Sequence, residues 1–143
     1  MMRFASLGSG SEGNGLLVEA GATRLLADCG FGLGDTIARL ARIGVEPDSI
    51  SAVLITHEHE DHIGGAARFA RKFGLPVWLT HGTQQAAAGQ ISDVATLKIF
   101  DCHQRFAVGD IEIEPYTVPH DAREPAQFVF GDGNLRVGLL TDA

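Results

Sequence analysis

The chain has 143 residues, a length that suits one domain and is short for two. Apolar residues make up 45% of it and charged residues 20%, which is typical of a globular protein and excludes a disordered chain or a coiled coil. Acidic residues outnumber basic ones by 18 to 11, so the formal net charge is −7. Because a surface that coats nucleic acid nonspecifically must be basic, this charge argues against such a coat, although it leaves a nucleic-acid substrate open.

Targeting segments and cysteines give little sign of a membrane or secreted protein. No apolar run reaches the roughly 18 residues that a membrane helix requires, and the N-terminus turns polar and glycine-rich before a signal peptide could form. Cys29 and Cys102 are too few for a disulfide framework and neither belongs to a CxxC motif. We therefore expect a cytoplasmic protein without a membrane partner, whose cysteines are buried thiols and not metal ligands.

Hydrophobic patterning predicts a strand-rich α/β chain. Strands are expected at 3–7, 16–19, 23–28, 52–56, 76–80, 96–100, 105–108, 111–118, 127–130 and 135–141. Further helices are expected at 63–73 and 83–90. A first helix is expected between Asp35, as its N-cap, and Gly44, with one apolar face made of Ile37, Leu40, Ala41 and Ile43. The continuous apolar run at 52–56 predicts a strand that is buried on both faces.

A dense cluster of potential metal ligands follows that buried strand. Residues 56–62 read Thr-His-Glu-His-Glu-Asp-His, and neutral imidazoles and carboxylates are the ligands of Zn²⁺ and related metals. In an extended loop His57 and His59 can face one point, while Asp61 and His62 face a neighbouring point. One loop could thus supply two metals about 3.5–4 Å apart, as two-metal hydrolases require. The alternative is a solvated polar loop, which this density of ligands disfavours; the intervening acids, Glu58 and Glu60, are expected to face solvent.

The HxHxDH spacing of residues 57–62 resembles the signature of the metallo-β-lactamase superfamily, a group of metal-dependent hydrolases with an αββα sandwich fold. Three further segments fit this resemblance: 26–30 before the motif, 118–122 at the position of a third histidine ligand, and 139–142 at the position of a bridging aspartate. The resemblance implies an α/β (α+β) fold in which residues 1–143 form one domain. That domain would be the N-terminal portion of the sandwich, a mixed sheet with flanking helices, and its second half would be incomplete.

Within this superfamily the chain is similar to the YycJ (WalJ) branch, on the segments 3–14, 28–31 and 80–83. That branch comprises metal-dependent hydrolases or 5′-exonucleases that act on DNA, and it is related more distantly to the RNase Z enzymes that process tRNA. The resemblance implies a two-metal enzyme that hydrolyses a phosphodiester, with DNA as its substrate, through a metal-activated hydroxide. Zinc or manganese is the expected metal, and iron is a further candidate. Two divalent cations would offset roughly four of the negative charges.

The resemblance also implies which residues bind these metals. The implied ligands are His57, His59 and His120 for the first metal, Asp61 and His62 for the second, and Asp142 as a bridge between them. Asp61 and His62 are the residues expected to act directly in catalysis. Superfamily members continue to a last histidine that completes the second metal, whereas this chain ends at Ala143. We therefore expect the apolar strand at 135–141 to be covered by a missing C-terminal segment or a homo-oligomer partner, or else a poorly formed second metal site.

Five more residues have both a functional and a plain interpretation. Asp28 is expected to orient the metal loop, with a strand-end turn as the alternative. Ser9, Ser11 and Asn14 either present polar groups to a phosphate or form a simple turn. His81 either reaches the site or caps a helix.

Two other functions stay open on the sequence. One is a small-molecule hydrolase acting on a thioester, a lactone or a cyclic phosphodiester, because the same metals serve all these reactions. The other is a fragment that binds metal without catalysis. An enclosed apolar pocket would favour the small-molecule hydrolase, and metal content without turnover would favour the fragment.

Overall fold

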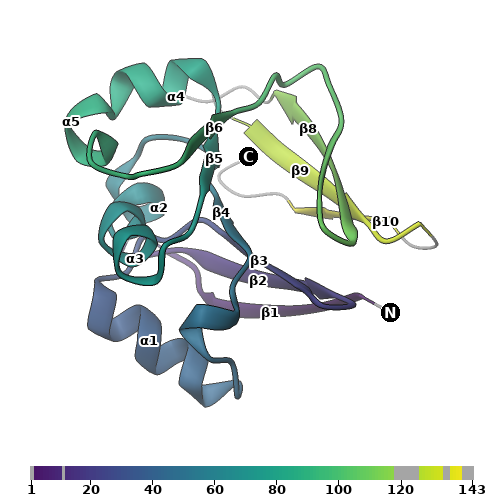
Figure 1. The fold of residues 1–143 in the computed structure, drawn as a ribbon, viewed down its shortest axis with the longest axis horizontal. Helices are drawn as coiled ribbons and strands as arrows, with labels where there is room; N and C mark the ends of the chain where they lie inside the picture. Colours follow the sequence, from purple (N-terminus) through teal and green to yellow (C-terminus); the bar gives the residue numbers. More distant parts are fainter. Residues whose placement is uncertain (1, 11, 118–125, 134–135, 140–143) are drawn as a thin grey trace.

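The structure is a computed structural model that describes residues 2–10, 12–117, 126–133 and 136–139 (Figure 1). The first sheet has the strand order β1-β2-β3-β4-β5-β6, and the second has the order β10-β9-β8-β7. The strands of the first sheet are β1 Met2–Gly8, β2 Gly15–Ala20, β3 Thr23–Ala27, β4 Ala52–Leu54, β5 Val77–Leu79 and β6 Leu97–Ile99. Those of the second sheet are β7 Phe106–Val108, β8 Ile111–Thr117, β9 Ala126–Gly131 and β10 Arg136–Leu139. The helices are α1 Leu33–Arg42, η1 Pro47–Ser49 (a 3-10 turn), α2 Glu60–Ile63, α3 Ala66–Phe73, α4 His81–Ala86 and α5 Ala88–Ile91.

The first sheet changes from antiparallel to parallel at its third strand. Strands β1, β2 and β3 pair as antiparallel neighbours, whereas β3, β4, β5 and β6 run parallel. Parallel neighbours need crossover connections, and the helices α1 to α5 lie within these connections. As a result, the carboxyl ends of β3, β4 and β5 lie at one edge of the sheet, where the segments after 27, 54 and 79 begin.

Two apolar cores lie on opposite faces of the first sheet. Because side chains alternate along a strand, Leu26 and Val53 pack on the helical side, with Phe69 of α3. Leu25 and Leu54 point the other way and pack against the second sheet. Figure 1 shows the helices on one side of the first sheet and β7 to β10 on the other. The predicted mixed sheet with flanking helices is therefore confirmed, and its central strands are buried on both faces.

The first helix differs from its prediction. It begins at Leu33 with Gly32 as its N-cap, not with Asp35, because the Thr36 amide already donates to the Gly32 carbonyl at 2.9 Å. The Thr36 hydroxyl donates to the same carbonyl. Asp35 instead pairs with Arg39 one turn later, at 2.9 Å. Thr36 and Leu40 are its buried residues, and Ile37 is half-buried. Ala41 and Ile43 are exposed, so the prediction that they belong to a buried apolar face was wrong, whereas it holds for Leu40 and in part for Ile37.

Two predicted helices are each interrupted. The helix predicted at 63–73 is divided into α2 and α3 at Gly64 and Gly65, where the amide of Gly65 donates to the Cys29 carbonyl at 2.8 Å. The helix predicted at 83–90 is divided at Ala87 into α4 and α5. The first interruption brings the histidine-rich segment against the end of β3. Within the described residues, no helix is long and apolar enough to cross a membrane.

Candidate metal centre

The histidine-rich loop lies at the carboxyl end of β4 and continues into α2. His59 precedes α2 in an extended conformation (φ −62°, ψ 141°), so the chain turns from loop to helix between His59 and Asp61. The ring centroids of His57 and His62 lie 4.0 Å apart, and those of His57 and His59 lie 4.7 Å apart. The loop therefore gathers three imidazoles at one place. His57 and His62 are buried, and His59 is half-buried.

Asp28 holds this loop from the neighbouring strand. It follows β3 with a left-handed backbone (φ 67°), and its amide donates to the Leu54 carbonyl at 2.7 Å. The Nδ1 of His62 donates to Asp28 Oδ2 at 2.6 Å, and the amide of Thr56 donates to Asp28 Oδ1 at 2.8 Å. The carboxylate is 1% exposed, so this burial is offset by its hydrogen bonds.

Thr56 extends the network from Asp28 to a second histidine. Its hydroxyl donates to Asp28 Oδ2 at 2.8 Å and accepts from the Nδ1 of His57, also at 2.8 Å. A carboxylate can only accept, so these contacts assign the Nδ1–H tautomer to both His57 and His62. Nε2 is then the nitrogen through which each ring would bind a metal. Partners of this kind orient histidine ligands in metal sites and increase their basicity.

The donor atoms of Asp61 and His62 have a spacing that suits a shared metal ion. Asp61 Oδ2 lies 3.6 Å from His62 Nε2. Two ligands of a tetrahedral zinc, each bonded at about 2.0–2.1 Å, would lie about 3.4 Å apart. Within the described residues no group of three or more His, Cys, Asp or Glu is arranged to hold a metal ion, and the predicted ligands His120 and Asp142 lie outside those residues. The residues present therefore fit part of a metal site.

The glycine-rich loop after β1 lies against Asp61. Asn14 is buried, and its amide nitrogen donates to the Asp61 carboxylate and to the Asp61 carbonyl, each at 3.1 Å. Ser9 is exposed and, with Glu12 and Arg39, lines a surface hollow of about 330 Å³. Ser11 lies outside the described residues. The structure thus brings Asn14, but not Ser9, to the predicted ligand.

The remaining predicted residues have other positions. His81 is exposed and lines a surface pocket of about 360 Å³ with Asp101 and Gln104, none of which belongs to the histidine loop. The helix cap is formed not by His81 but by Thr80, whose hydroxyl accepts from the Thr83 amide at 3.2 Å. Glu60 is exposed, whereas Glu58 is half-buried, contrary to expectation. Both cysteines are buried as expected, and burial raises the pKa of the Cys29 thiol to about 12.

Sequence reasoning missed the contribution of Thr56 and of two glycines. A Cβ atom on Gly30 would overlap the carbonyl group of Asp61, and one on Gly65 would overlap the carbonyl oxygen of Phe31. The segment after β3 and the histidine-rich loop therefore touch through their backbones, and the Cys29 amide donates to the His62 carbonyl at 2.7 Å. The sequence did offer a sign of two of these residues: Gly30 directly follows Asp28-Cys29, and Thr56 stands where the buried apolar run ends.

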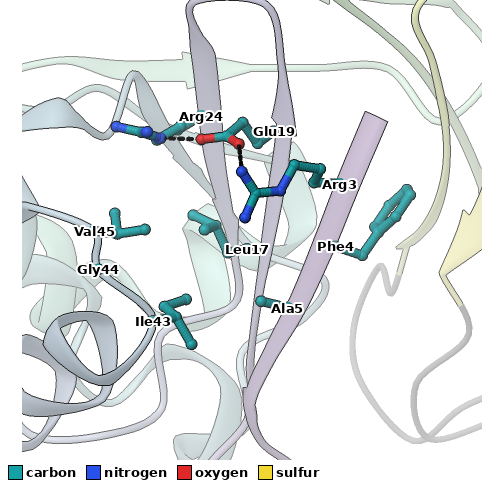
Figure 2. Close-up of a pocket in the computed structure, with 9 residues that line it drawn as sticks. All are labelled: Arg3, Phe4, Ala5, Leu17, Glu19, Arg24, Ile43, Gly44 and Val45. Atoms are coloured by element: carbon teal, nitrogen blue, oxygen red, sulfur yellow. Dashed lines mark hydrogen bonds and ion pairs between the residues drawn. The ribbon is translucent and has the colours of Figure 1, made fainter. Parts of the chain in front are cut away.

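A further pocket lies at the start of β3, opposite the end of that strand that Asp28 follows (Figure 2). It has a volume of about 210 Å³, and Glu19 in its wall forms ion pairs with Arg3 and Arg24. Arg24 lies at the start of β3, whereas Asp28 follows its end. The pocket is thus separate from the histidine loop.

Comparison with known proteins places the chain in a family. The model of the metallo-beta-lactamase superfamily matches residues 8–143. The chain is 37% identical over 143 residues to Exodeoxyribonuclease YycJ of Bacillus anthracis, covering 99% of this chain and 54% of that protein. It is 33% identical over 148 residues to Ribonuclease TTHA0252 of Thermus thermophilus, covering 98% of this chain and 31% of that protein. The chain spans about half the length of the exodeoxyribonuclease.

Solved structures share the fold. The Rm3 metallo-beta-lactamase superposes with a TM-score of 0.75 at 19% identity, over 94% of this chain and 56% of that one. The metallo-beta-lactamase fold protein YhfI from Bacillus subtilis also gives a TM-score of 0.75, at 20% identity, over 96% of this chain and 61% of that one. At such identity the similarity concerns the fold alone. The match of the family model to residues 8–143 establishes that this chain belongs to the metallo-β-lactamase superfamily.

Proposed function

We propose that the protein is a two-metal-dependent phosphodiesterase that degrades DNA from an end. The observation that carries this proposal is the network in which Asp28 and Thr56 fix the Nδ1 atoms of His57 and His62. A general polar loop would not need His62 fixed by a buried carboxylate and His57 fixed in the same tautomer by a hydroxyl bound to that carboxylate. The relatives named as exodeoxyribonucleases support DNA as the substrate. A cytoplasmic location remains a prediction.

In the proposed site the chain supplies the ligands. His57, His59 and His120 would hold one metal, Asp61 and His62 the other, and Asp142 would lie between them. Bound metals would supply a hydrolytic nucleophile from water near neutral pH and would neutralise phosphate charge. The chain's own contribution is orientation. Asp28 accepts a hydrogen bond from the Nδ1 of His62, and the Thr56 hydroxyl accepts one from the Nδ1 of His57.

The test is metal-dependent cleavage of end-labelled DNA. Purified protein loaded with Zn²⁺ or Mn²⁺ should release mononucleotides or short products from one end, and a chelator should stop the reaction. Asp61→Asn removes a ligand charge with little change of shape, and should reduce turnover by about a hundredfold or more while the protein stays folded. Asp48→Asn, an exposed position of η1, is the matched control and should be fully active.

Other outcomes would redirect the assignment. Hydrolysis of a thioester or lactone, with no cleavage of DNA by the same metal-loaded protein, would favour the small-molecule hydrolase. Stoichiometric metal without turnover of any ester would favour a binding role. Equal loss of folding and activity in Asp61→Asn would mean that Asp61 supports the structure and not the chemistry.

A further inference from the structure

Asn14 lies between the glycine-rich loop and the metal loop. The two N–H groups of its amide are shared among three acceptors, Asp61 Oδ2 and the Asp61 carbonyl, each at 3.1 Å, and the Gly10 carbonyl at 2.9 Å. Its side-chain oxygen accepts from the Gly10 amide at 3.2 Å. Both ends of the amide are therefore hydrogen-bonded, and the residue is 8% exposed.

We infer that Asn14 is a positioning residue for Asp61, and that it fixes which carboxylate oxygen of Asp61 faces the metal. This inference rests on the proposed function, in which Asp61 is a ligand. The oxygen that Asn14 contacts, Oδ2, is also the one that lies 3.6 Å from His62 Nε2. A hydrogen bond to a ligand carboxylate restrains its rotation, so less conformational entropy is lost when the metal binds.

Asn14 can fix Asp61 because its own backbone is held in place. The Gly30 amide donates to the Asn14 carbonyl at 3.1 Å. A Cβ atom on the preceding residue, Gly13, would overlap the ring of Phe31, so the loop lies directly on that ring. Phe31 is held in turn by the Arg39 guanidinium, which stacks on its ring at 3.9 Å and donates to the Leu7 carbonyl.

The alternative is that Asn14 only fastens the glycine-rich loop through Gly10. The two interpretations predict different dependence on Asp61. A residue that only fastens the loop would act equally with or without the Asp61 carboxylate. A positioning residue would lose part of its effect once that carboxylate is removed.

Asn14→Ala is the test variant and Ser6→Ala is the matched control. Ser6 lies in β1 next to this loop, and its hydroxyl accepts from the amide of Gly8, the last residue of that strand, at 3.2 Å. Metal affinity is measured by competition with a chromophoric chelator for Zn²⁺. We expect Asn14→Ala to reduce the affinity for one of the two metal ions by about tenfold, and Ser6→Ala to bind both ions as the wild type does. Unchanged affinity in Asn14→Ala would overturn the inference.

A double-mutant cycle in metal-free protein gives a second measurement. Urea unfolding of Asn14→Ala, Asp61→Ala and the double variant yields the coupling between the two residues. We expect a coupling of more than about twofold in the unfolding equilibrium constant, and strict additivity would overturn the inference. If the wild type binds no metal, the proposed function fails, and this cycle still decides whether Asn14 acts through Asp61.

Discussion

The carboxylate of Asp28 accepts a 2.6 Å hydrogen bond from the Nδ1 of His62, and both side chains are buried. The two residues are 34 positions apart in sequence, one after β3 and the other in α2. Parallel pairing of β3 with β4 places them at the same edge of the sheet. Because this hydrogen bond fixes the tautomer of His62, Asp28 is part of the proposed metal site although it would not bind the metal itself.

Replacing Asp28 should weaken metal binding more than it changes the shape of the site. Asp28→Asn keeps the volume but removes the charge that orients the Nδ1–H of His62. We expect a loss of about ten- to a hundredfold in Zn²⁺ affinity, measured by chelator competition. Asp48→Asn, the same change at an exposed position, should bind as the wild type does. Equal affinity in the two variants would mean that Asp28 does not orient a ligand.

The hydroxyl of Thr56 should matter more than its methyl group. Thr56→Val leaves the buried Asp28 carboxylate and the His57 Nδ1 each without one partner, whereas Thr56→Ser keeps both contacts. We expect Thr56→Val to reduce the free energy of unfolding by about 1–3 kcal/mol, and Thr56→Ser to reduce it by less. Urea unfolding of the metal-free proteins measures both. A larger loss in the serine variant would contradict the hydrogen-bond explanation.

A methyl group at Gly30 should disrupt the contact between the β3 end and the metal loop. Gly30→Ala places a Cβ atom on the carbonyl of Asp61, so backbone must move. We expect a loss of about 3 kcal/mol or more in the free energy of unfolding. Gly34→Ala is the control, because its Cβ atom meets nothing within 4 Å and alanine favours a helix. Thermal unfolding should show that Gly34→Ala is at least as stable as the wild type.

The Cys29 thiol should be unreactive in the folded protein. Desolvation raises its pKa from 9.0 to about 12, so almost none is thiolate at pH 8. Iodoacetamide at that pH should leave Cys29 unmodified in native protein and modify it after unfolding, as peptide mass spectrometry would show. Rapid native labelling would contradict its burial.

The same shift predicts a dependence of stability on pH. Between about pH 9 and 12 the unfolded chain releases the Cys29 proton while the folded chain retains it. The folded state binds more protons in this window, so the free energy of unfolding falls as pH rises. Cys29→Ser should show a smaller decline from pH 9 to 10.5. Identical slopes in both proteins would show that Cys29 does not contribute.

The sequence alone determined where most strands lie along the chain, and it predicted a metal-binding role for residues 56–62. Alternation and apolar runs predicted the strands, because a strand buried on one or both faces must repeat its apolar residues accordingly. The density of histidines and carboxylates in 56–62 indicated metal chemistry, because those side chains share a preference for the same ions. Helix boundaries were predicted less well, as the early start of α1 shows.

The sequence predicted that Asp28 orients that loop, but only the tertiary structure showed its partners and the supporting contacts of Asn14 and Thr56. Asn14, Asp28 and Thr56 are distant in sequence from one or both of their partners, and a hydrogen bond between distant residues leaves no local pattern. In the sequence Gly30 is marked only as a glycine that follows Asp-Cys, and the structure supplies the reason for it, because a Cβ atom there would overlap the carbonyl of Asp61. The order of strands in the first sheet brings these segments together at one edge, and long-range packing, not local propensity, sets that order.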